Sequence, residues 1–79
     1  MVNNNIGSSI RHFRKKRGIR QSDLAASVGI SNGMLSRVEN GKSSVGFDSL
    51  LLIWNKLNVS IYFVDNQDIK ERIIYGSEV

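Results

Sequence analysis

The residues best suited to chemistry lie close together in one segment of this 79-residue sequence, and all of them suit contact with DNA bases. Asn32 can make a bidentate hydrogen bond to adenine, Arg37 one to guanine, and Met34 an apolar contact to the methyl group of thymine. Ser36 is a weaker candidate of the same kind, and Gly33 suits the crowded tip of a helix that enters the major groove. The segment therefore predicts a helix whose exposed face contacts base edges.

Residue patterns for other kinds of chemistry are missing from the sequence. His12 is the single histidine and there are no cysteines, so no spacing typical of metal ligands occurs. No acid and nucleophile can be placed beside His12 by pattern, and no glycine-rich phosphate loop follows a strand. We therefore expect a protein that is not an enzyme and that requires neither a metal nor another cofactor.

Apolar periodicity predicts the first of the helices that must position this segment. Ile6, Ile10 and Phe13 recur at the spacing of one helical face, while the opposite face is basic. Gly18 follows the last basic turn, where a glycine ends many helices. The pattern predicts a helix over residues 6–17.

Two shorter helices are predicted over residues 21–28 and 32–40, joined by a tight turn that contains glycine. Ser31 is a favourable N-cap for the second of them. Two helices joined in this way form the layout of a helix-turn-helix, in which the second helix lies in the major groove. A hairpin turn at Asn40-Gly41 is the alternative, but the flanking apolar residues repeat at three and four, which favours a helix end.

The C-terminal half combines a fourth helix with a strand-like segment. The helix over residues 47–57 carries Leu51 and Leu52 outside its main apolar stripe, which favours a second partner such as another subunit. Residues 59–64 are rich in β-branched and aromatic side chains and predict a strand. Its partner stays open: residues 69–75 in a hairpin, the same strand of a second copy, or neither, with 69–75 as a short helix.

Charge is distributed unevenly along the chain. The first 42 residues carry eight Lys or Arg and two acids, whereas the rest carries three Lys or Arg and five acids. The net charge of +4 therefore divides into +6 and −2, which predicts a polyanion-binding surface at one end. No secretory signal or transmembrane run is apparent, so we expect a cytoplasmic, nucleoid-associated protein with no membrane partner.

Motifs spread over most of the chain resemble one family. They are Ile6-Gly7, Ile10-Arg11, Arg14-Lys15, Gly18-Ile19, Gln21-Ser22-Asp23-Leu24-Ala25, Val28-Gly29-Ile30-Ser31, Leu35-Ser36-Arg37-Val38-Glu39-Asn40-Gly41-Lys42 and Leu57-Asn58-Val59. In this order and spacing, residues 6–61 resemble the Cro/C1-type (XRE family) helix-turn-helix domain of phage repressors and small bacterial regulators. The resemblance implies an all-α, lambda-repressor-like fold of four to five helices. It also implies a short C-terminal dimerising β-strand like that of HipB-like antitoxins.

The resemblance also implies roles for individual residues. Gln21, which opens the second helix, would contact the DNA backbone or an outer base. The turn after the third helix would present backbone amides and a cation to phosphate. Arg14 and Glu39 would form a structural ion pair, and Arg20, which replaces the usual Thr or Ser cap, would face phosphate. The full set expected at DNA is Gln21, Arg20, Ser31, Asn32, Gly33, Met34, Ser36, Arg37, Asn40 and Lys42, the turn also including Gly41.

These observations predict a sequence-specific DNA-binding regulator, a repressor or autoregulator, that binds a palindromic operator as a homodimer. Residues 6–61 would form the DNA-binding domain and residues 62–79 a C-terminal extension for dimerisation. The expected dimer interface comprises Leu51, Leu52, Ile61, Tyr62, Phe63 and Val64. One alternative is an antitoxin that neutralises a toxin protein and autoregulates its operon, and another is a restriction-modification controller protein.

Overall fold

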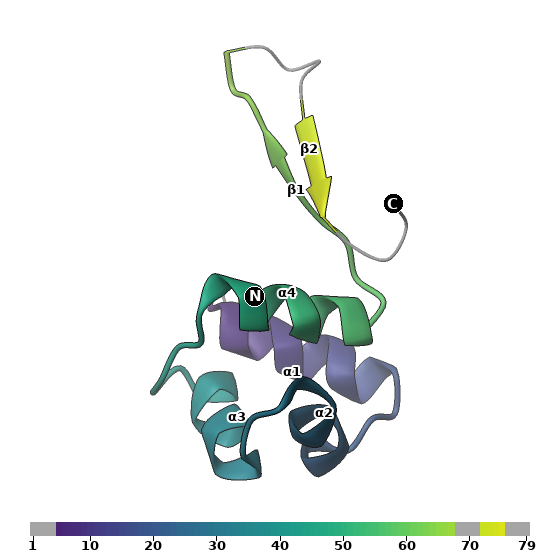
Figure 1. Cartoon of the computed structure of the whole chain (residues 1–79), viewed down its shortest axis with the longest axis vertical. Helices are drawn as coiled ribbons and strands as arrows, with labels where there is room; N and C mark the ends of the chain where they lie inside the picture. The colour runs from purple at the N-terminus through teal and green to yellow at the C-terminus, as the bar shows by residue number, and fades with distance from the viewer. Residues whose placement is uncertain (1–4, 68–71, 76–79) are drawn as a thin grey trace.

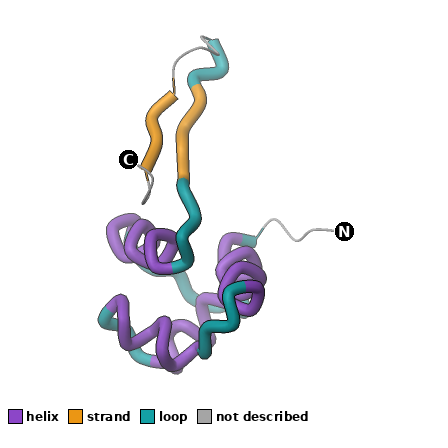
Figure 2. The backbone as a smooth tube through the Cα atoms, turned by 90° about the vertical axis from the view of Figure 1, so that its right-hand side faces the viewer, coloured by secondary structure: helices purple, strands orange, loops and turns teal. Residues whose placement is uncertain are grey.

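A computed structural model describes residues 5–67 and 72–75 of the chain. Its elements in order are α1 (Ile6–Lys16), α2 (Gln21–Val28), α3 (Asn32–Glu39), α4 (Phe47–Lys56), β1 (Ile61–Val64) and β2 (Arg72–Tyr75). The four helices pack together, and the two strands project from them as a hairpin along the long axis of the molecule (Figures 1 and 2). The predicted fold of four to five helices with a C-terminal strand is confirmed, and the described residues contain four helices.

Each helix occupies its predicted segment, but three of them end one residue early. Arg17, Asn40 and Leu57 are capping residues that follow α1, α3 and α4. At the start of α1, the side chain of Asn5 accepts a hydrogen bond of 2.6 Å from the backbone N–H of Gly7. Such a cap supplies one of the partners that the first turn of a helix lacks.

Apolar residues from all four helices form one core. Eight of them are buried: Ile10, Leu24, Ala25, Leu35, Val38, Ile53, Trp54 and Leu57. The ring of Phe13 packs edge-to-face against Trp54 with centroids 6.0 Å apart. Because a chain of this size buries a modest fraction of its surface, the quality of this packing decides whether the fold is stable.

A close helix crossing fixes α1 on α3. Gly7 is buried at this crossing, and a Cβ atom added to it would overlap the backbone carbonyl of Val38. Backbone cannot move aside as a flexible side chain can, so only glycine fits at position 7. The crossing holds the N-terminal end of α1 against the C-terminal end of α3.

The hairpin resolves the alternatives that the sequence left open. β1 pairs antiparallel with β2 in the register Ile61 to Tyr75 and Val64 to Arg72. Asn58 adopts a left-handed conformation after α4, with φ at 58°, and β1 begins at Ile61. The helical interpretation of 69–75 is therefore wrong for residues 72–75, while residues 69–71 lie outside the described part of the chain. No helix in the described ranges is long and apolar enough to span a membrane.

Candidate nucleic-acid interface

The α2–α3 connection is a tight turn that sets the position of the third helix. Gly29 ends α2 in the left-handed region, with φ at 79°, which favours glycine. The N–H of Ile30 then donates to the carbonyl of Ala25 at 3.0 Å. The hydroxyl of Ser31 accepts a hydrogen bond of 3.0 Å from the N–H of Met34 and so caps α3. The Ser31 hydroxyl is therefore engaged within the chain, where it fixes the start of α3.

One face of α3 packs into the core and the opposite face is open. Leu35, Val38 and Glu39 are buried, whereas Asn32, Gly33 and Arg37 are exposed. The predicted base-contacting residues are therefore accessible together on one short helix. The helix lies at the end of the molecule remote from the hairpin (Figures 1 and 2).

Met34 and Ser36 lie at the edge of the open face. Both are half-buried, and Met34 packs against the core. The Sδ atom of Met34 lies 3.9 Å from Nη2 of Arg37, so the guanidinium rests against the thioether. The structure thus gives Met34 a structural contact and makes it a support for Arg37.

A buried polar network ties the first three helices together. Nε of Arg14 donates to Oε2 of Glu39 at 2.8 Å, and Nη2 donates to Oε1 at 3.0 Å. Nη1 of Arg14 donates to the carbonyl of Ile19 at 3.0 Å. The two side chains are 11% and 2% exposed, so the ion pair implied by the family resemblance is present and nearly dry. Bidentate pairing of this kind adds geometric specificity to charge attraction.

Gln21 belongs to the same network, which the sequence did not predict. Its Nε2 donates to Oε1 of Glu39 at 3.1 Å, and the side chain is half-buried. The carboxamide is therefore oriented by a carboxylate on α3 before any DNA binds. The hydrogen bond thus joins the start of α2 to the end of α3.

The Asn40-Gly41-Lys42 turn differs from its prediction. The N–H groups of Asn40, Gly41 and Lys42 donate to the carbonyls of Ser36, Val38 and Arg37 at 3.1, 3.1 and 2.8 Å. The side-chain amide of Asn40 also donates to the carbonyl of Ser36. These donors complete the end of α3, so they are not presented to phosphate as the resemblance implied. The exposed Lys42 side chain is the part of the turn that can contact phosphate.

Two basic residues near α2 have partners inside the chain. Nε of Arg20 lies 2.8 Å from Oδ2 of Asp23 in an exposed ion pair, and Arg20 makes no side-chain cap on α2. Nε of Arg17 donates to the carbonyl of Leu57 at 3.1 Å and so joins the end of α1 to the end of α4. Lys15 and Lys16, which precede Arg17 at the end of α1, are exposed and have no ion pair among the described residues.

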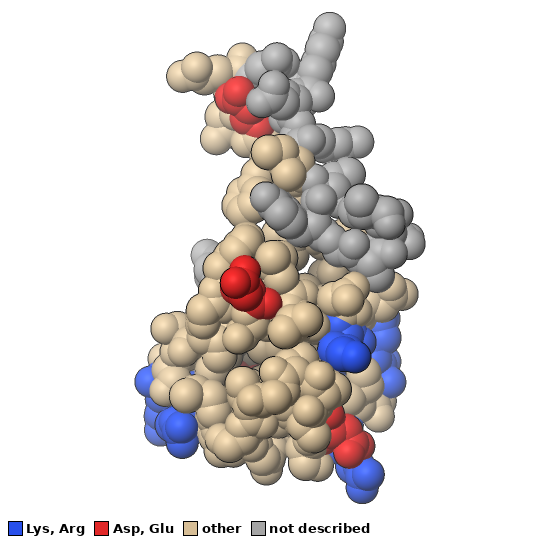
Figure 3. Space-filling model, viewed as in Figure 1, with Lys and Arg blue, Asp and Glu red and all other residues tan. Residues whose placement is uncertain are grey.

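Charged residues are distributed unevenly over the face of the molecule that Figure 3 shows. In Figure 3, Lys and Arg lie at the sides of the helical part, and acidic atoms appear on its front, beside basic atoms at its lower right, and near the far end of the hairpin. No group of three or more metal-ligating side chains occurs in the part of the chain that the structure describes. The open face of α3 carries Asn32 and the cation Arg37, and Lys42 is exposed in the turn that follows, which suits a polyanion whose base edges can be contacted.

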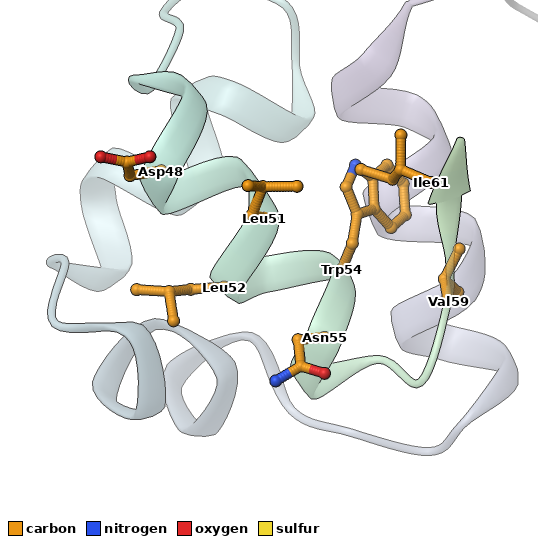
Figure 4. Close-up of a pocket in the computed structure, with 7 residues that line it drawn as sticks. All are labelled: Asp48, Leu51, Leu52, Trp54, Asn55, Val59 and Ile61. Carbon is orange, nitrogen blue, oxygen red and sulfur yellow. The ribbon is translucent and has the colours of Figure 1, made fainter. Parts of the chain in front are cut away.

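The residues expected at the dimer interface fall into two groups. Ile61 is half-buried and packs on the core, and the ring of Phe63 lies 6.3 Å from that of Phe47. Leu52, Tyr62, Phe63 and Val64 are exposed, and Leu51 is half-buried. A pocket of about 430 Å³ opens between α4 and β1, lined by Asp48, Leu51, Leu52, Trp54, Asn55, Val59 and Ile61 (Figure 4).

The fold and the open face of α3 define a helix-turn-helix DNA-binding domain. Residues 10–64 match the family described as Helix-turn-helix. The chain belongs to this family, in its XRE or Cro/C1 type, a family of DNA-binding regulators that are not typically enzymes. The prediction of a helix-turn-helix DNA-binding domain is confirmed.

A curated relative gives a second comparison. The chain is 41% identical over 63 residues to the protein named Antitoxin PezA from Streptococcus pneumoniae serotype 4. The match covers 80% of this chain and 40% of that protein, so the chain spans less than half the length of this relative.

Proposed function

We propose that α3 enters the major groove of double-stranded DNA and that Asn32 and Arg37 contact base edges there. The observation that carries this proposal is that α3 has one buried and one open face. Leu35, Val38 and Glu39 hold the buried face in the core, and the opposite face is exposed. Gly33 lets the backbone of α3 approach the bases closely, and Ser36 borders the same face. Lys42 and Arg20 contact phosphate, with Gln21 held in place beside them by Glu39.

The protein acts as a repressor or autoregulator in the cytoplasm and binds a palindromic operator as a homodimer. Two-fold symmetry in the protein requires half-sites whose centres are about one helical turn, roughly 34–36 Å, apart. Residues 6–61 serve as the DNA-binding domain, and residues 62–79 contribute to dimerisation. Support for the dimer comes from the exposed apolar side chains of α4 and the hairpin, Leu52, Tyr62 and Val64.

Three variants test the assigned contacts. Arg37→Ala is expected to weaken binding to the preferred site by about 1–3 kcal/mol and to relax discrimination at one base pair. Arg37→Lys is the matched control, since it keeps the charge but loses the planar fork that pairs with guanine. Lys42→Ala is expected to weaken all sequences alike and to reduce the dependence of affinity on salt. An Arg37→Ala protein with unchanged site preference would overturn the assignment of that side chain.

A second candidate function is supported by the relative named Antitoxin PezA. In this function the protein neutralises a toxin protein, and DNA binding serves to autoregulate the operon. The test is expression of the chain together with the gene that adjoins its own. Co-purification of the two proteins, with relief of growth arrest, would establish the antitoxin function, and normal growth on expression of the neighbour alone would remove it.

A further inference from the structure

We infer that α4 packs antiparallel against α4 of a second copy, with a two-fold axis passing beside Leu52. This inference rests on the homodimer of the proposed function and specifies its geometry. The interface would be isologous, so each contact between two different residues occurs twice. Its occupant is a second copy of this chain, and the reason lies in the charge pattern of α4.

Asp48, Leu52 and Lys56 are spaced four residues apart and therefore follow one side of α4. All three are exposed, and Leu52 is 48% exposed in spite of its size. Figure 4 shows Asp48 and Leu52 pointing to the same side of the helix. An exposed leucine thus lies midway between an acid and a base.

The order acid, leucine, base along α4 is complementary to that of a second α4 running in the opposite direction. In an antiparallel pair centred on Leu52, Asp48 faces Lys56 of the partner subunit, and its own Lys56 faces Asp48 of the partner subunit. Neither Asp48 nor Lys56 has an ion-pair partner among the described residues, so both charges are available for these contacts. The hollow between α4 and β1 adjoins Leu52 and receives Leu52 of the partner subunit.

The placement of α4 in the fold permits this dimer. α4 lies on one side of the helical part with α1 behind it, while α2 and α3 lie at the end remote from the hairpin (Figures 1 and 2). A two-fold axis parallel to the long axis and in front of α4 leaves both α3 helices on the same side of the dimer. Both could then face one DNA duplex, with the two hairpins directed away from it.

The two α4 helices bury too little area on their own, so the hairpins must contribute to the interface. A helix of 10 residues is about 15 Å long, so two such helices alone bury less than the 1,200–2,000 Å² of a typical stable interface. Antiparallel packing places the hairpin of each subunit, which follows its α4, beside the start of the partner's α4. The exposed Tyr62 and Val64 supply the additional apolar area.

Opposite charges at the two ends of a helix also stabilise the helix itself, because they complement its dipole. That effect acts within one chain, whereas the proposed contacts join two chains. Mixing of charge-reversed variants separates the two explanations, since a dipole effect cannot be relieved by a second molecule.

The experiment uses sedimentation velocity on the full chain without DNA. Asp48→Lys and Lys56→Asp should each raise the dissociation constant of the homodimer by about 10- to 100-fold, since two attractive contacts become repulsive. An equimolar mixture of the two variants should form a heterodimer close to wild type, because both contacts are again attractive. Asp23→Lys, which makes the same charge change on α2, is the matched control and should dimerise normally. Circular dichroism establishes that each variant is folded.

The outcomes separate this inference from the proposed function. Wild-type dimers whose stability is unaffected by either reversal would overturn the α4 arrangement while leaving the homodimer intact. Variants that dissociate but are not rescued on mixing would overturn it as well. A wild-type chain that is monomeric at tens of micromolar would remove both the homodimer and this interface, but not DNA binding through α3.

Discussion

Replacement of Glu39 by glutamine tests the buried network that positions α3. The carboxylate accepts hydrogen bonds from Nε and Nη2 of Arg14 and from Nε2 of Gln21, at 2.8, 3.0 and 3.1 Å. Glu39→Gln keeps the shape of the side chain but removes its negative charge. The amide nitrogen of glutamine is itself a donor and would face the donors of Arg14 or Gln21. The Arg14 guanidinium, whose side chain is 11% exposed, is then left without its counter-ion.

The expected cost is large relative to the stability of the fold. Removal of one partner from a buried ion pair costs about 3–5 kcal/mol, because it leaves an uncompensated charge. A 79-residue chain has a free energy of unfolding of about 4–12 kcal/mol at typical values per residue. Glu39→Gln should therefore remove a quarter or more of the stability and, for an m value of about 1.5 kcal/mol/M, lower the urea midpoint by about 2–3 M.

Urea unfolding followed by tryptophan fluorescence measures this effect. Trp54 is the single tryptophan and is 8% exposed in the core, so its emission reports on core packing. All variants are compared at one protein concentration, since dimerisation contributes to apparent stability. Asp23→Asn, which breaks the exposed pair with Arg20, is the matched control and should cost at most about 1 kcal/mol.

A double variant separates the charge from the packing. Arg14→Met with Glu39→Leu replaces both charges by apolar groups and should recover to within about 1 kcal/mol of wild type. Because Gln21 then loses its partner, DNA affinity should stay reduced even though stability returns. A loss below about 1 kcal/mol for Glu39→Gln would refute the reasoning that the pair is dry and essential to helix packing.

Three further substitutions follow from the local geometry. Gly7→Ala forces α1 and α3 apart at the carbonyl of Val38 and should lower the thermal midpoint, at a cost of about 1–3 kcal/mol or more; an unchanged midpoint would show that the crossing is looser than described. Gly33→Ala meets only Arg37 Nη1, at 3.6 Å, so it should stabilise the free protein by about 0.5–1 kcal/mol yet weaken DNA binding in a titration; unaltered affinity would argue against close approach at position 33. Arg20→Ser supplies the missing cap of α2 and should stabilise the fold by about 0.5–1 kcal/mol in urea, and it should also weaken DNA binding; a destabilised protein would show that the pair with Asp23 matters more than the cap.

The helices and the helix-turn-helix could be predicted because their signals are local. Apolar spacing located all four helices, although Ile6 on the predicted apolar face of α1 is exposed, and Ser31 and Gly29 marked the turn by their capping roles. The open residues of α3 followed from the same periodicity. Local sequence patterns of this kind predict single helices and turns, whereas they do not specify the long-range contacts between them.

The contacts that depend on distant backbone could not be predicted. The charge asymmetry predicted a polyanion-binding surface in the first 42 residues, yet Arg17 of that part donates to the carbonyl of Leu57, 40 residues away in the chain. The amides of the turn after α3 are used to end that helix, which depends on how the last turn closes rather than on residue type. The partner of β1 was undecided because a strand pattern does not encode which edge it pairs with.

The most direct test of the account is selection of bound sequences from random duplex DNA by the purified chain. The account predicts enrichment of a palindrome with half-sites about one helical turn apart. It also predicts that the same selection with Arg37→Ala loses its preference at one symmetric pair of positions. A selection that enriches no sequence would contradict the proposal that α3 contacts base edges.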